Sequence, residues 1–173
     1  MIAPAASTEA RATGRREPRP VIVFEVAGRA MAIPAGEVLE IRSTDSLAGE
    51  AAAFEPLEFP WIRHTIEREG TLHYVVNLGV LFSLARTRPT LVLFLRGAQC
   101  ALLVDRIERM DAISWVFALP RAFRGSERSW YLGLALFDDE VVPMLNARGI
   151  LTPEQQAQLA ARLPETLAGT VPA

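Results

Sequence analysis

The chain has little of what disulfide-stabilised proteins and lysine-dependent enzymes require. Its 173 residues include one cysteine, Cys100, which excludes a disulfide within the chain and a zinc site built from cysteines. The 18 basic residues are all arginine, so no lysine is present for Schiff-base or P-loop chemistry. The net charge of −2 gives no general attraction to nucleic acid or acidic membranes. We therefore expect a protein of the reducing cytoplasm that binds no nucleic acid.

Long apolar runs are also absent. No stretch approaches the roughly 20 apolar residues that a membrane helix needs. The first seven residues lack the basic region and apolar core of a signal peptide. We expect a soluble chain that does not insert into a membrane.

Short strands account for most of what is present. Half of the residues are hydrophobic, and apolar segments recur at short intervals between glycine or aspartate turns. This pattern predicts an all-β barrel or sandwich rather than βαβ units. The expected strands cover 21–26, 31–33, 40–42, 61–66, 71–76, 91–95, 100–104, 105–110, 131–137 and 140–145. Residues 43–60 are expected to form a loop and 113–128 an irregular segment.

Helices are expected to be few. Pro34 suits the first turn of a short helix over 34–39. Asn77 and Asn146 can each cap a helical turn, and Thr152 with Gln155 predicts a capping box that opens a C-terminal helix.

A weak internal repeat suggests two similar units. Tyr74-Val75-Val76-Asn77 matches Pro143-Met144-Leu145-Asn146, and each run ends a predicted hairpin and starts a helical turn. Two similar small barrels would give that pattern. We divide the chain into a flexible N-terminal tail (1–20), one β domain (21–151), and a C-terminal helix with its tail (152–173).

Catalytic patterns are scarce. The serines lack a nucleophile-elbow pattern, and no glycine-rich phosphate loop is present. His64 and His73 lie on opposite arms of one predicted hairpin and could bind a metal with Glu67, but histidines on a hairpin face are more often ordinary surface residues. We expect no enzyme, no cofactor and no metal site.

Binding features are more suggestive. Val38, Leu39 and Ile41 form an apolar set that could line a groove for a helix. Trp61, Trp115 and Trp130 are expected in the core. Alternatively, they lie at a barrel rim and anchor a partner. Cys100 alternates with apolar neighbours and is expected in the core.

An ordered series of motifs runs over about 21–151. The series begins with residues 21–28 and the Ile33-Pro34 and Val38-Leu39-Glu40-Ile41 segments. It continues through Gly70, Val75-Val76-Asn77-Leu78 and Leu102-Leu103-Val104-Asp105, and closes with Tyr131-Leu132-Gly133 and residues 141–145. This series resembles the CheW-like domain family, and the resemblance implies two small five-stranded β-barrels in tandem. It also implies a non-catalytic adaptor that links the cytoplasmic tips of chemoreceptors to the histidine kinase CheA.

The central turn departs from the family pattern. Glu67-Arg68-Glu69-Gly70 stands where Asn-Leu-Arg-Gly is usual, so the arginine position carries Glu69. His64, Tyr74 and Asn77 replace a usual glycine, proline and aspartate. We expect the partner-binding residues to be Val38, Leu39, Ile41, Glu67, Glu69, Gly70, Tyr74 and Asn77. The partner surface should complement Glu69, and a CheW-like module that serves a different partner outside the receptor–kinase array is the alternative.

Overall fold

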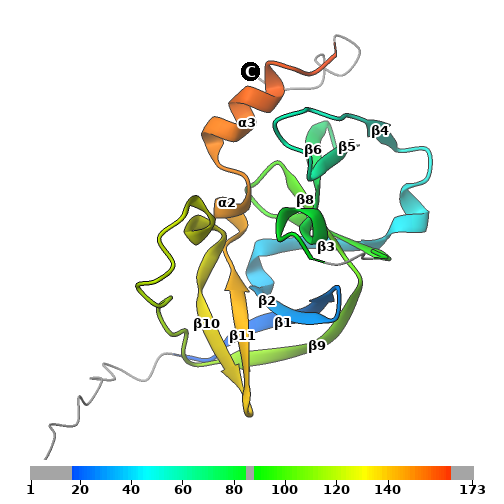
Figure 1. Cartoon of the computed structure of the whole chain (residues 1–173). Helices are drawn as coiled ribbons and strands as arrows, with labels where there is room; N and C mark the ends of the chain where they lie inside the picture. The colour runs from blue at the N-terminus through cyan, green and yellow to red at the C-terminus, as the bar shows by residue number, and fades with distance from the viewer. Residues whose placement is uncertain (1–16, 85–87, 165–173) are drawn as a thin grey trace, which may run out of the picture.

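The computed structural model describes residues 17–84 and 88–164. Two antiparallel-rich β-sheets form the body of the protein, and the helices are short (Figure 1). The all-β prediction is confirmed. In the described ranges, no helix is long and apolar enough to cross a membrane.

Sheet A combines both ends of the domain. Its strand order is β10-β11-β2-β1-β9. The bounds are β1 (Arg19–Val26), β2 (Arg29–Pro34), β9 (Arg106–Ile113), β10 (Tyr131–Phe137) and β11 (Glu140–Leu145). Strand β11 pairs in parallel with β2 through Met144 and Ala32, which joins the C-terminal hairpin to the N-terminal one.

Sheet B contains the middle of the chain, in the order β3-β7-β8-β6-β5-β4. The bounds are β3 (Val38–Ser43), β4 (Ala51–Ala53), β5 (Ile62–Arg68), β6 (Thr71–Asn77), β7 (Leu91–Leu95) and β8 (Cys100–Val104). The two β units are therefore interleaved in sequence, because all strands of sheet B come after β2 and before β9 of sheet A.

Helical segments connect the strands. They are the 3₁₀ turns η1 (Ala35–Glu37), η2 (Thr44–Leu47) and η3 (Ser126–Trp130), and the helices α1 (Leu78–Leu81), α2 (Ala147–Ile150) and α3 (Pro153–Ala160). The predicted capping box opens α3: Thr152 Oγ1 accepts from the Gln155 N–H, and Gln155 Oε1 accepts from the Thr152 N–H. Leu159 anchors α3 in the core.

Three apolar clusters hold the sheets. One lies inside sheet A and includes Val23, Phe137 and Met144, and one lies inside sheet B and includes Val75 and Phe94. The largest joins the two sheets with α2 and α3. Cys100 belongs to this large cluster, and burial raises the pKa of its thiol to about 12. The prediction that Cys100 is a core residue is confirmed.

Several local predictions were wrong. The predicted helix over 34–39 is only the 3₁₀ turn η1, because Pro34 still belongs to β2 and Val38 already belongs to β3. The predicted loop over 43–60 contains η2 and β4, which pairs with β5. Strand β1 begins at Arg19, two residues inside the predicted tail, whose residues 1–16 lie outside the described ranges.

Two side-chain predictions also need correction. The Asn146 side chain does not cap α2; its amide donates instead to the Ser129 carbonyl, 3.0 Å away. Trp115 is exposed rather than buried, while Trp61 and Trp130 are half-buried against the central cluster. Asn77, in contrast, caps α1 as predicted, since its Oδ1 accepts from the Val80 N–H at 3.2 Å.

Candidate protein-binding surface

The turn between β5 and β6 has a conformation that selects its residues. Glu69 (φ 51°) and Gly70 (φ 73°) both have positive φ, and they are the only two residues between the paired Arg68 and Thr71. Two central residues with positive φ define a type I′ hairpin turn, whose twist matches that of the strands. Gly70 adopts this conformation without a steric penalty, whereas Glu69 does so at a cost. Glu69 is therefore held at the tip by the backbone, and its side chain is 78% exposed.

An ion pair ties this tip to β3. Arg68 Nε lies 2.5 Å from Glu40 Oε2, and Arg68 Nη1 lies 3.2 Å from Glu69 Oε2. Arg68 is the most enclosed of the three side chains, at 21% exposure. One guanidinium thus serves two carboxylates, and most of the Glu69 carboxylate still faces solvent. The contact fixes the hairpin tip beside β3.

A pocket of about 330 Å³ lies between the tip and its neighbours. Leu39 of β3 and Leu95 of β7 supply apolar walls, Arg68 and Glu69 a charged one, and Gln156 of α3 a further polar group. This volume is at the lower end of the range for small-ligand pockets, so it suits one or two inserted side chains rather than a whole helix.

His73 also lines this pocket, and its side chain is buried. The ring packs edge-on against Phe94, with 5.3 Å between centroids, and Nδ1 lies 3.1 Å from the Thr71 carbonyl oxygen. Burial lowers the pKa of His73, and the nearby Arg68 charge acts in the same direction. The imidazole therefore acts as a neutral, mainly structural group.

The outer side chains of β3 continue the surface. Leu39 and Ile41 are 38% and 40% exposed and alternate with the less exposed Glu40 and Arg42. Strand β3 is an edge strand of sheet B, so no further strand covers it within the described residues. Arg42 turns away and pairs with Glu50 at 2.9 Å. The result is an apolar strip, Leu39 and Ile41, beside the charged tip.

The expected binding residues do not all meet here. The structure brings Leu39 and Glu69 into one pocket, with Ile41 and Gly70 close to them in the chain, while Val38 packs partly against the core. Glu67 is exposed on β5. Tyr74 is 1% exposed and packs on Phe54, so its place in the expected contact surface was wrong. Asn77 ends β6 at the opposite end from the tip, roughly 20 Å away for a strand of that length.

The two histidines do not form a metal site. His64 is exposed and pairs across the hairpin with Val75, whereas the buried His73 pairs with Ile66. Across residues 17–84 and 88–164, no three His, Cys, Asp or Glu side chains gather in a way that could hold a metal ion.

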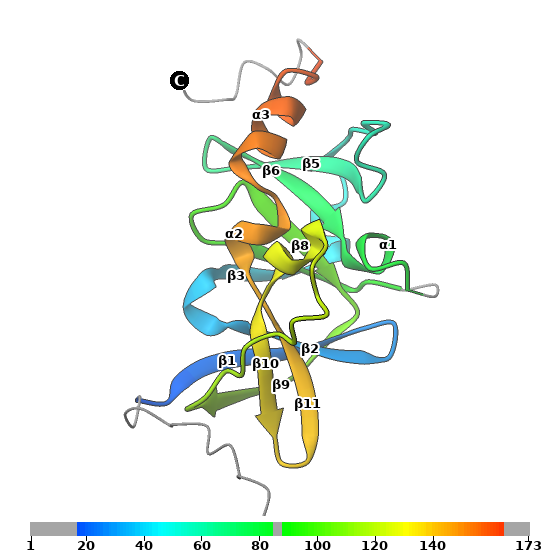
Figure 2. The same ribbon diagram turned by 60° about the vertical axis from the view of Figure 1, so that its left-hand side comes forward.

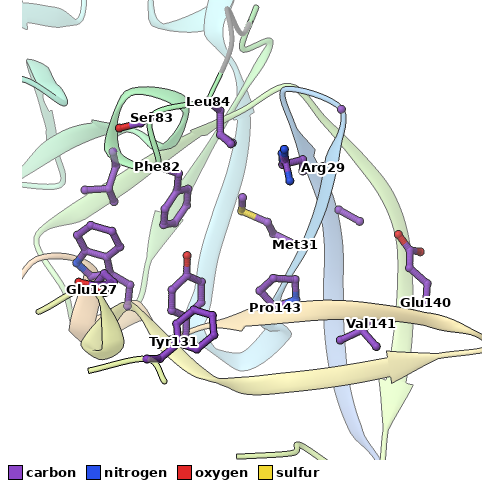
Figure 3. Close-up of a pocket in the computed structure, with 15 residues that line it drawn as sticks. Arg29, Met31, Phe82, Ser83, Leu84, Glu127, Tyr131, Glu140, Val141 and Pro143 are labelled. Carbon is purple, nitrogen blue, oxygen red and sulfur yellow. The ribbon is translucent and has the colours of Figure 1, made fainter. Parts of the chain in front are cut away.

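A second hollow, of about 720 Å³, opens between β2, β10 and β11 of sheet A and the turn that follows α1 (Figure 3). Phe82 packs against Trp130 and Tyr131 at its floor, with centroid distances of 5.6 and 5.9 Å. Met31 and Pro143 line its other side. None of the expected binding residues lies in it.

Comparison with known proteins identifies the family. The model of the CheW-like domain matches residues 20–155. The chain belongs to the CheW-like domain family. CheW-like proteins are non-catalytic scaffolds, which confirms the expectation that this chain is not an enzyme and places it among the scaffold and adaptor proteins of chemotaxis.

A solved structure agrees with the CheW-like fold. The scaffolding protein TtCheW from Thermoanaerobacter tengcongensis is 16% identical, with a TM-score of 0.65 over 80% of this chain and 96% of that one. At that identity the match shows the fold. No curated protein matches the chain.

Sequence reasoning missed the Arg68–Glu40 contact in this CheW-like chain. The two residues are 28 positions apart, and neither stands out by composition. Glu40 lies between the apolar Leu39 and Ile41, which is typical of a strand whose charged side chain faces the opposite side from its apolar neighbours. No local signal, however, connects it with the hairpin tip.

Proposed function

We propose that this protein is an adaptor of a bacterial chemosensory system, and that it couples chemoreceptors to a CheA-type histidine kinase in the cytoplasm. Family membership supports the adaptor role, and the resemblance of the sequence motifs supports these partners. The observation that carries the proposal is that Leu39 and Glu69 line one pocket, with Ile41 exposed two residues further along β3. An apolar centre with a charged rim is the usual composition of a protein interface.

The apolar strip supplies the contact energy in this proposal. Leu39 and Ile41 can rest against the apolar stripe of a helix, which presents side chains at i, i+3 and i+4. Glu69 lies at the exposed rim, where a charge affects association rate and partner choice more than affinity. A partner with a basic residue opposite Glu69 is favoured over one with an acidic residue.

Titration calorimetry with the regulatory domain of the CheA-type kinase and with a receptor-tip fragment from the same organism tests the proposal. Ile41→Arg should weaken binding of the partner on this surface by about tenfold or more, since it places a charge within the apolar strip. Leu57→Arg is the matched control, because Leu57 is 94% exposed in the loop before β5, outside the strip.

Glu69→Arg should weaken the same complex by a smaller factor that shrinks as salt is added. If both fragments bind the Ile41→Arg variant as tightly as the wild type, this surface is not a docking site. If neither binds the wild type at all, the alternative applies: a CheW-like module that serves a different partner.

A further inference from the structure

The outer face of the β10–β11 hairpin is unusually apolar. Leu134 lies opposite Pro143 and Leu136 opposite Val141 in the antiparallel register. Opposed residues share a face, so these four side chains project together to the side away from the sheet A interior. Their chain neighbours, such as Ala135 and Val142, point inward and are buried. No charged side chain interrupts this outer face over the paired positions 134–136 and 141–143.

Residues 115–117 extend the same face beyond the edge of β10. The Phe117 N–H donates to the Leu134 carbonyl at 2.8 Å, and the Leu134 N–H donates to the Phe117 carbonyl at 2.9 Å. Gly133 permits this approach, because a Cβ there would lie 2.3 Å from the Phe117 oxygen. Trp115 is two residues before Phe117, so in an extended chain both side chains project to the same side.

The exposed area is appropriate for a protein interface. Trp115, Phe117, Leu132, Leu136 and Val141 each keep between 46% and 60% of their surface exposed. With about 150–250 Å² for a large side chain, the five present on the order of 500 Å² of apolar surface. That is near the upper end for the largest patch of a monomer. A standard interface of about 800 Å² per partner, some 60% apolar, contains about the same amount.

Charges of opposite sign mark the two ends of this apolar face. Asp138 and Asp139 form the hairpin turn at one end, followed by Glu140, whose carboxylate lies 3.8 Å from Arg109. The loop before η3 and η3 itself lie at the other end, where β10 begins, and together they carry Arg121, Arg124 and Arg128. Arg124 and Arg128 donate to the backbone carbonyls of Arg121 and Phe123, which holds them within this loop. A seven-residue strand separates the two ends by roughly 20 Å.

This arrangement is complementary to itself. A twofold axis that lies in the contact plane and crosses the strands brings two such faces together with β10 antiparallel to β10 of the second copy. The acidic turn of each copy then meets the arginine loop of the other, whereas an axis along the strands would place like charges together. We propose that the protein forms a homodimer through the outer face of β10–β11 and residues 115–117, in this antiparallel orientation.

The proposed dimer leaves the adaptor surface, formed by β3 and the β5–β6 hairpin tip, accessible. The β10–β11 turn projects from the end of the molecule opposite to α3, far from the β5–β6 hairpin (Figures 1 and 2). Dimerisation and adaptor binding therefore use separate surfaces, and each can fail without the other.

Analytical ultracentrifugation of the full chain tests the dimer. The wild type should show a reversible monomer–dimer equilibrium in the micromolar range, as expected for an interface at the small end of the standard size. Leu136→Glu should raise the dissociation constant by about tenfold or more, because it places a charge at the centre of the contact. Leu57→Glu is the control, since it introduces the same charge at an exposed leucine elsewhere and should leave the equilibrium unchanged.

Charge-reversed variants test the orientation. Asp139→Arg and Arg124→Asp should each weaken the homodimer, because both ends of the contact then carry like charges. An equimolar mixture of the two variants should recover dimer, since each end of the mixed pair again joins opposite charges. Circular dichroism establishes that each variant is folded.

Three results would overturn the proposal. The first is a wild type that stays monomeric far above the micromolar range, and the second is an equal loss of dimer with Leu57→Glu. The third is a Leu136→Glu variant with unchanged sedimentation but no binding to the kinase domain, which would assign the face to that partner. A mixture that dimerises no better than its components would refute the antiparallel orientation.

Discussion

Replacing Glu69 by asparagine should stabilise the protein while removing the charge at the hairpin tip. Glu69 has φ 51° in a turn whose next residue is Gly70. A side chain with a Cβ costs roughly 1–2 kcal/mol in this left-handed conformation, and asparagine tolerates it better than glutamate does. Asn-Gly is also the preferred pair for a type I′ turn.

The lost contact with Arg68 offsets part of this gain. Its Nη1–Oε2 distance is 3.2 Å, but the Glu69 side chain is 78% exposed, and ion pairs at such sites contribute about 0–1 kcal/mol. Arg68 also keeps its closer contact with Glu40. We expect Glu69→Asn to raise the free energy of unfolding by about 0.5–1 kcal/mol, which corresponds to about 1–4 °C in Tm for a chain of this length.

Urea unfolding of the wild type, Glu69→Asn and Glu69→Ala measures the effect. The two variants both lack the carboxylate and differ in their tolerance of positive φ. At equal slope, the asparagine variant should therefore have the higher midpoint, by an amount that corresponds to about 1 kcal/mol in the free energy of unfolding. An alanine variant as stable as the asparagine variant would show that backbone conformation does not limit stability here. Because Glu69→Asn folds at least as well as the wild type, any loss of partner binding in it reports the charge alone.

Three further predictions concern packing, pH and capping. Gly133→Ala should destabilise the protein by about 1–3 kcal/mol and expose 115–117 to proteolysis, because the new Cβ would collide with the Phe117 carbonyl oxygen. Lowering the pH below about 6.5 should decrease the urea midpoint. Burial lowers the pKa of His73, so the unfolded chain binds the proton more readily than the folded chain does. His73→Leu should remove that part of the pH dependence. Thr152→Ala should lower the free energy of unfolding by about 1 kcal/mol through loss of the α3 capping box, and an unchanged urea midpoint would show that α3 is held by packing alone.

The sequence predicts well those elements whose signal is local. The hairpin of β10 and β11 has its predicted bounds, because two apolar runs on either side of an Asp-Asp turn specify both strands. The α3 capping box is likewise a local pattern, formed by Thr152 and Gln155. The position of Gly70 could also be predicted, because the central turn requires a residue with positive φ there and glycine adopts it without a steric penalty.

Features that depend on distant partners could not be predicted. Alanine has little preference for strands, so β4 exists because the edge of β5 pairs with it. Tyr74 stands where the family has proline and resembles a surface substitution, yet β6 lies between β5 and β8, which buries it. The Arg68–Glu40 contact requires the hairpin tip to lie beside β3, and no spacing in the sequence reveals that.

The interleaving of the two sheets has a consequence for synthesis on the ribosome. All strands of sheet B lie within 38–104, so this unit can form while the C-terminal third of the chain is still being made. Strands β1 and β2 emerge first but must wait for β9 and β11 to complete sheet A. During that interval the apolar side chains of the first hairpin lack most of their native cover, and a ribosome-stalled chain ending near residue 110 should bind chaperones more strongly than the full-length chain.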